Sequence, residues 1–190
     1  IVPTLKVLND EFNIVAGHIE SVHSYTNDQN LIDNFHKKAR RGRSAALNMV
    51  ITETGAGKAV GQVLPELIGK LTANAVRVPT PNVSLAIMNL QLGRDITVEE
   101  VNDFLRQKAF HSDLKEQIGF TNSPEVVSTD FVGDRHAGII DSAATLVNGN
   151  KCVLYVWYDN EYGYTAQLLG LAKEMVGLTY QRYPNFTETS

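Results

Sequence analysis

The feature that most constrains the fold of this chain is a set of short apolar runs rich in β-branched residues. Apolar and polar positions alternate through residues 14–22, with the two-residue period of a strand that buries one face. Similar runs lie at residues 75–78, 83–90 and 152–158, and turns rather than helical repeats separate neighbouring runs. Strands therefore outnumber helices, which predicts an α+β domain whose mixed, largely antiparallel sheet is covered by helices. This is not the alternating pattern of a dinucleotide-binding domain.

Helices and further short strands are predicted from spacing. Residues 3–12 place apolar side chains at helical intervals, and residues 97–100 form a Thr-Val-Glu-Glu capping box that starts a second helix. A last helix at residues 165–176 is apolar over a wide face, which indicates a second partner surface. Two short strands are predicted around residues 125–127 and 138–142.

Composition and charge exclude several classes of function. Hydrophobic residues make up 43% and charged residues 20%, as in an ordinary globular domain, and no apolar run reaches the roughly 20 residues that span a bilayer. The net charge of −4 offers no basic surface for nucleic acid, and the first residues do not resemble a signal peptide. The single cysteine, Cys152, lies in an apolar strand and is interpreted as a core thiol in a reducing setting. We therefore predict a cytoplasmic protein without a metal site and without nucleic-acid or membrane partners.

Two polar residues stand at unusual places in the predicted strands. His23 ends the first strand where the chain enters a polar loop, and a histidine titrates near neutral pH. Arg77 lies within an apolar strand, so it is either a structural ion pair or a ligand clamp, because an unpaired buried charge is costly. The loop at residues 25–47 is long and basic, which fits a solvated loop, an anion-binding loop or a subunit contact. Its positive charges are Lys37, Lys38, Arg40, Arg41 and Arg43.

A glycine-containing turn at residues 52–58 precedes an amphipathic run. Such a turn is a ready anion site, because free backbone N–H groups and the helix dipole point toward it. It is not a nucleotide P-loop, since Thr52 stands where the first glycine is needed and Ala59 where a metal-binding hydroxyl is needed. A smaller phosphate held by Thr54 and the Gly55 N–H remains open, as does a simple helix cap by Thr54.

Five segments contain these residues, and together the segments resemble the catalytic domain of phosphorylating glyceraldehyde-3-phosphate dehydrogenase. They are residues 22–26, 54–60, 77–84, 128–131 and 157–164. The most specific are Arg-Val-Pro-Thr, which begins at Arg77, and Trp-Tyr-Asp-Asn-Glu, which begins at Trp157. The resemblance implies a mixed sheet with helices on one face.

The resemblance also implies a domain organisation. It predicts a catalytic domain at residues 1–177, followed by a polar tail at residues 178–190. The helix at residues 164–177 would pack against a dinucleotide-binding domain that this chain does not contain, which would explain its wide apolar face. We interpret the Asn-Phe-Thr sequon at Asn185 as a chance match.

Roles for individual residues follow from the resemblance alone. His23 would be the general base that activates a cysteine thiol and assists hydride transfer. Thr26 and Arg77 would hold the phosphate of the substrate, glyceraldehyde 3-phosphate. Asn160 would hydrogen-bond the nicotinamide amide of NAD or NADP, and Tyr164 would pack close to that ring. The implied reaction yields 1,3-bisphosphoglycerate through a covalent thioester.

A second phosphate site is implied for the attacking inorganic phosphate, at Thr54, Gly55 and Arg43. In the family the basic loop lies between subunits, which implies a homotetramer. The family's nucleophilic cysteine would lie a few residues before Ile1, outside this chain, and Cys152 does not occupy its position. The resemblance therefore implies that this chain by itself is inactive.

Two other functions remain open. A close relative of the family oxidises erythrose 4-phosphate, but it departs from this chain at Thr26, which favours the triose enzyme. The other alternative is a non-catalytic, free-standing domain for binding or assembly. The intact set of site residues argues against such a domain, whereas the missing cysteine argues for it.

Overall fold

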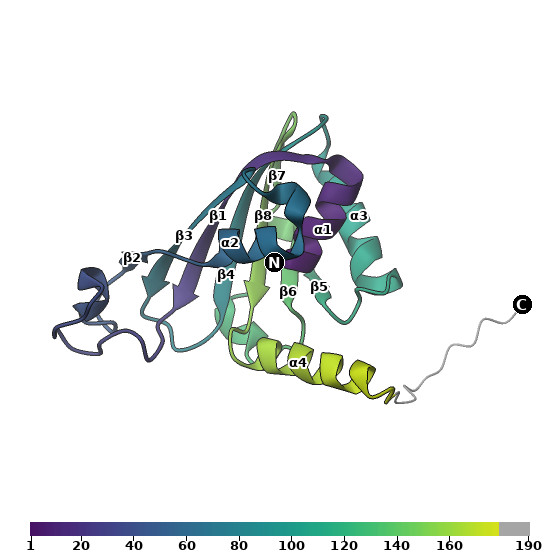
Figure 1. Cartoon of the computed structure of the whole chain (residues 1–190). Coiled ribbons are helices and arrows are strands. Elements are labelled where there is room, and N and C mark those ends of the chain that lie inside the picture. Colours follow the sequence, from purple (N-terminus) through teal and green to yellow (C-terminus); the bar gives the residue numbers. More distant parts are fainter. Residues whose placement is uncertain (179–190) are drawn as a thin grey trace, which may run out of the picture.

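A mixed eight-stranded sheet forms the centre of the computed structural model, which describes residues 1–178 and all their side chains except those of residues 56–58 (Figure 1). The strand order is β2-β3-β1-β4-β8-β6-β5, and β7 also pairs with β8. The pairs β1–β3 and β5–β6 are parallel and the others antiparallel, which confirms the predicted mixed sheet. The strands are β1 (Ile14–Ser24), β2 (Val50–Thr52), β3 (Leu71–Val78), β4 (Ser84–Leu92), β5 (Ile118–Thr121), β6 (Gly138–Asp141), β7 (Leu146–Asn148) and β8 (Lys151–Tyr158).

Three helices cover one face of this sheet, namely α1 (Val2–Phe12), α2 (Ala56–Val63) and α3 (Val98–His111), while α4 (Tyr162–Met175) runs along one end (Figure 1). The apolar stripes of α1, α2 and α3 pack with β1, β4 and β8 into one main core. Thr97 caps α3 by accepting a hydrogen bond from the Glu100 N–H at 3.1 Å. No helix within residues 1–178 is long and apolar enough to cross a membrane. The sequon at Asn185 and all of the predicted tail except Leu178 lie outside the described residues.

The predicted strand at residues 125–127 is wrong, because local side chains capture the backbone there. Pro124 has no N–H to donate, the Glu125 N–H binds the Ser123 hydroxyl, and the Val127 N–H binds the Asp130 carboxylate at 2.7 Å. The strand that pairs with β6 is instead β5. The prediction of turns between strands also fails in two places, because α2 separates β2 from β3 and α3 separates β4 from β5.

Helix α2 starts next to the predicted phosphate-binding turn. The helix begins at Ala56, its cap residue is Gly55, and the cap position has no side-chain hydrogen bond. Thr54 lies one residue before this cap residue.

Strand register explains why polar residues gather at one end of the sheet. In the parallel pair of β1 and β3, His23 stands opposite Arg77. In the antiparallel pair of β4 and β8, Ser84 stands opposite Tyr158. The carboxyl ends of β1, β3 and β8 thus meet the amino ends of β4 and β6, and α4 crosses this same end (Figure 1).

Candidate active site

A pocket of about 550 Å³ lies at this end of the sheet. The first turn of α1, the start of α2, the ends of β1 and β8, and α4 form its walls. Four of the residues singled out from the sequence line it together: His23, Thr54, Asn160 and Tyr164. Ser21, His136, Tyr158, Asp159 and Gln167 contribute further polar groups.

His23 has the properties of a general base. Its Nδ1 lies 2.6 Å from the Ser24 carbonyl oxygen, so this nitrogen carries the proton and Nε2 is the basic nitrogen. Partial burial lowers the pKa of His23, and the positive charges of Arg77 and Arg41 lower it further, against the effect of the Ser24 contact. The imidazole is therefore neutral at neutral pH and able to accept a proton.

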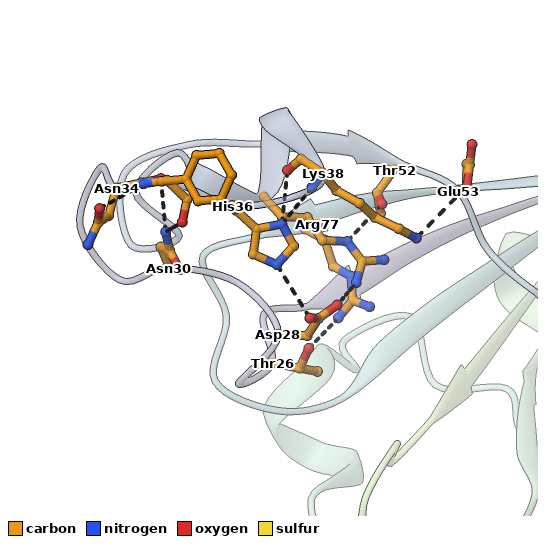
Figure 2. A network of polar contacts seen from close by, with 11 residues as sticks. Thr26, Asp28, Asn30, Asn34, His36, Lys38, Thr52, Glu53 and Arg77 are labelled. Carbon is orange, nitrogen blue, oxygen red and sulfur yellow. Dashed lines mark hydrogen bonds and ion pairs between the residues drawn. The ribbon is translucent and has the colours of Figure 1, made fainter.

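Arg77 is half-buried beside His23. Its Nη1 donates to the Ser24 carbonyl at 3.0 Å and to Thr26 Oγ1 at 3.2 Å, and it lies 3.1 Å from His23 Nδ1 (Figure 2). In residues 1–178 these contacts go to a carbonyl, a hydroxyl and an imidazole rather than to a carboxylate, and its Nε is buried without a partner. Burial and the charge of Arg41 lower the pKa of Arg77. An arginine with its charge incompletely compensated favours an anionic ligand.

The basic loop brings Arg41, rather than Arg43, close to this arginine. Arg41 pairs with Asp28 and donates through Nε to Thr52 Oγ1 at 3.1 Å. Arg43 is 64% exposed and pairs with Asp33, away from the pocket lining. Figure 2 shows how the loop folds back on itself, with His36 and Arg77 both directed at the segment that holds Thr26 and Asp28. Sequence reasoning missed the difference because both arginines belong to one basic run.

Of the three predicted inorganic-phosphate residues, Thr54 and Gly55 lie at the start of α2, next to the pocket, and Arg43 does not. Thr54 lines the pocket, and Gly55 directly precedes the first turn of α2. A Cβ added to Gly55 would meet no atom within 4 Å, so its backbone is open to a ligand. A helix amino terminus beside a pocket offers N–H groups to an anion.

Asn160 is held firmly between strand β8 and helix α4. The neighbouring Asp159 is buried, and its carboxylate accepts hydrogen bonds from the N–H groups of Glu161 and Tyr162 at 2.9 and 2.8 Å and of Gly133 at 2.9 Å. Although burial opposes ionisation, these donors lower the pKa of Asp159. They also start α4 at Tyr162, earlier than the predicted residue 165.

The side-chain amide of Asn160 has a defined orientation. Its Oδ1 accepts hydrogen bonds from Ser24 Oγ at 3.0 Å and from Ser84 Oγ at 3.1 Å. The amide nitrogen is therefore the group that remains for the pocket, next to the largely exposed ring of Tyr164. An N–H donor beside an aromatic ring fits a flat ring that carries a carboxamide, so these residues fit nicotinamide.

A second histidine, His136, lines the pocket and was missed from the sequence. Its Nδ1 lies 2.8 Å from Asp134 Oδ1, and this hydrogen bond raises the pKa of His136 against the effect of burial. Nearby, Gln167 Nε2 on α4 donates to the carbonyls of Glu116 and Arg135 at 2.9 and 2.8 Å. The two contacts of Gln167 join segments far apart in the chain, so no local sequence pattern predicts them.

The fold and site together define an α+β domain that holds a histidine beside a half-buried arginine and, in the same pocket, an amide donor, which are the groups of a ligand-binding site. Comparison with known proteins agrees: residues 1–160 match the family "Glyceraldehyde 3-phosphate dehydrogenase, C-terminal domain". The chain belongs to this family, which confirms the resemblance found in its motifs.

Individual relatives extend the match over nearly the whole chain. A glyceraldehyde-3-phosphate dehydrogenase-like protein of Pseudomonas aeruginosa is 62% identical over 97% of this chain and 40% of its own length. Glyceraldehyde-3-phosphate dehydrogenase 1 of Bacillus subtilis is 47% identical over 90% of this chain and 51% of its own length. The chain thus spans about half, or less, of these curated relatives.

Proposed function

We propose that this chain is the substrate-binding and proton-transferring part of a phosphorylating glyceraldehyde-3-phosphate dehydrogenase. The reaction converts glyceraldehyde 3-phosphate, inorganic phosphate and NAD or NADP to 1,3-bisphosphoglycerate. The observation that carries the proposal is the placement of one neutral imidazole, that of His23, beside Arg77 and in the same pocket as Asn160. A base, an anion clamp and a carboxamide donor are three groups that this reaction needs.

His23 acts as the base in two steps of the proposed mechanism. Its Nε2 first takes the proton of a cysteine thiol supplied from outside this chain, and the thiolate adds to the aldehyde carbon. The protonated Nε2 returns this proton to the oxyanion that the addition forms, and takes it again from the resulting hydroxyl while the C–H bond breaks. The bound nicotinamide supplies the acceptor for the hydride. Phosphate finally displaces the thiolate from the thioester.

The two phosphate groups are bound at different places in this proposal. Arg77 and Thr26 bind the substrate phosphate, because Nη1 already lies 3.2 Å from the threonine hydroxyl and a phosphate accepts from both groups. Thr54 and Gly55 bind the attacking phosphate from the α2 side. Arg41 donates to Thr52 Oγ1 and its charge acts on Arg77, so we add it to the predicted Arg43 as a phosphate-binding residue.

Two exposed apolar surfaces support the remaining parts of the proposal. On α4, Leu168, Leu169, Leu171 and Met175 are all more than half exposed, which fits the predicted contact with a dinucleotide-binding domain. On the basic loop, Leu31, Ile32 and Phe35 are 61%, 75% and 90% exposed, which fits a subunit contact in a homotetramer.

The test is a dehydrogenase assay on the full-length protein that carries this chain. The absorbance of the reduced cofactor is followed with glyceraldehyde 3-phosphate and with erythrose 4-phosphate, each with and without inorganic phosphate. We expect turnover with the triose, dependent on phosphate, and none with the 190-residue chain alone. Preference for the tetrose would select the related enzyme. No turnover by a folded full-length protein with either aldehyde would point to a binding or assembly domain.

A further inference from the structure

We propose that two buried serines, Ser24 and Ser84, fix the polarity of the Asn160 side-chain amide, so that this site accepts only a hydrogen-bond acceptor from its ligand. The inference rests on the proposed function, because the ligand group concerned is the carboxamide oxygen of the nicotinamide. The two serines are positioning residues: they act through Asn160 and do not themselves contact the cofactor.

The sheet brings the three side chains together from distant parts of the chain. Ser24 ends β1, Ser84 begins β4, and Asn160 follows the end of β8. Because β4 lies between β1 and β8, these ends are adjacent. Both serines are almost completely buried, with 0% and 1% of their surface exposed, so water does not replace a lost hydrogen bond.

The hydrogen bonds around the serines determine which way their protons point. Ser84 Oγ already accepts the Ser24 N–H at 3.3 Å and also shares a hydrogen bond with the Tyr158 hydroxyl. Its own proton is therefore available for Asn160 Oδ1 at 3.1 Å. Ser24 Oγ directs its proton to the same oxygen at 3.0 Å, and the structure gives this hydroxyl no other acceptor in residues 1–178.

A flipped amide would break this arrangement. Rotation of Asn160 would place its two N–H groups against two hydroxyls that are both set to donate. The Ser24 proton would then be buried without an acceptor, which is costly. The flip is therefore disfavoured, and the amide nitrogen stays directed at the pocket. A ligand carbonyl gains a hydrogen bond there, whereas a ligand N–H meets another donor.

The experiment compares two analogues of NAD in the full-length protein by titration calorimetry. The 3-acetylpyridine analogue keeps a carbonyl acceptor but has no N–H, whereas the 3-aminopyridine analogue has only N–H donors. We expect the wild-type protein to bind the acetyl analogue about fivefold to tenfold more tightly, the range of one hydrogen bond. In the double variant Ser24→Ala/Ser84→Ala the ratio should approach one, because Asn160 is then free to present its oxygen.

Controls separate this effect from general damage to the site. Ser142→Ala removes a seryl hydroxyl that donates to the Thr121 carbonyl, away from the pocket, and should leave the ratio unchanged. The single variant Ser24→Ala should lower the ratio partway, and it provides the test if the double variant does not fold. Equal weakening of both analogues in these serine variants would overturn the inference. A wild-type protein that binds neither NAD nor an analogue would instead overturn the proposed function.

Discussion

The two histidines that line the pocket have opposite electrostatic environments. His23 lies near Arg77 and Arg41, and its pKa is lowered by burial and by their positive charges. His136 lies 2.8 Å from the Asp134 carboxylate, and its pKa is raised by that hydrogen bond. Both rings are partly buried, and burial alone would lower the pKa of each. Burial is the largest influence on the pKa of His23, whereas the hydrogen bond with Asp134 is the largest on that of His136, so the two pKa values move in opposite directions.

This difference separates a chemical role from a structural one. His23 is neutral at neutral pH and keeps Nε2 as a basic nitrogen on the pocket. His136 is hydrogen-bonded to Asp134 and to the backbone of Lys115, so its ring connects two loops next to α4. His23 thus supplies a base to the pocket, whereas His136 stabilises the loops against which α4 packs. Substitutions at the two histidines should have effects of different kinds.

The largest expected effect is that of His23→Asn. Loss of the base should slow the redox step by about 10²- to 10⁴-fold, the usual contribution of general base catalysis. Single-turnover formation of the reduced cofactor by the full-length protein measures this step. His136→Asn should slow the same step far less, since Nε2 of His23 is retained. An unaltered rate in His23→Asn would remove His23 from the mechanism.

The next effect concerns the charges that set the pKa of His23. Arg77→Gln should lower kcat/KM for the phosphorylated aldehyde about 10- to 100-fold, because hydrogen bonds with charged groups contribute roughly 1.5–3 kcal/mol. It should also raise the pKa of His23, since one positive neighbour is lost. The acidic limb of the kcat/KM profile would then move to higher pH.

A matched control for this variant is Arg106→Gln on α3, where the guanidinium pairs with Asp103 at the surface. It should change neither the kinetic constant nor the pH profile. If Arg77→Gln lowered kcat/KM equally for an unphosphorylated aldehyde, Arg77 would not be the phosphate clamp.

Much of the fold could be predicted because its signals are local. Alternation through residues 14–22 located β1, and the Thr97 cap located the start of α3. The prediction failed at residues 125–127, where apolar composition suggested a strand but Pro124 and the Asp130 carboxylate divert the backbone into a turn. Local hydrogen bonds from side chains outweighed β-propensity there.

Some residues of the candidate site could likewise be predicted from the sequence, and others could not. Arg77 could be singled out because a charge inside an apolar strand demands a partner, and the motif resemblance assigned its role. Ser24 and Ser84 could not, because their contacts with Asn160 are set by strand register rather than by sequence spacing. The partner of His136, Asp134, is only two residues away, but the place of His136 in the pocket is set by loop packing. The contact of Ser84 with Asn160, for example, spans 76 positions of the chain. Only the folded sheet brings such residues together.

The smallest effect should come from Asp134→Asn, and its pH dependence gives a sharp test of the comparison. The raised pKa of His136 means that its share of stability is present below the unfolded value of about 6.5 and is lost as pH rises through the folded pKa. The lowered pKa of Asp134, which its contacts with His136 produce against burial, means that its share is present above about 3.9 and is lost in acid. The pair therefore stabilises the fold most between these limits, by less than about 1 kcal/mol, since both side chains are about a third exposed.

The temperatures of thermal unfolding of wild type and Asp134→Asn, measured across pH, should differ most near pH 5 and converge above neutrality. If the difference in unfolding temperature between the two proteins did not change with pH, His136 would be neutral. The two histidines would then differ in position rather than in charge.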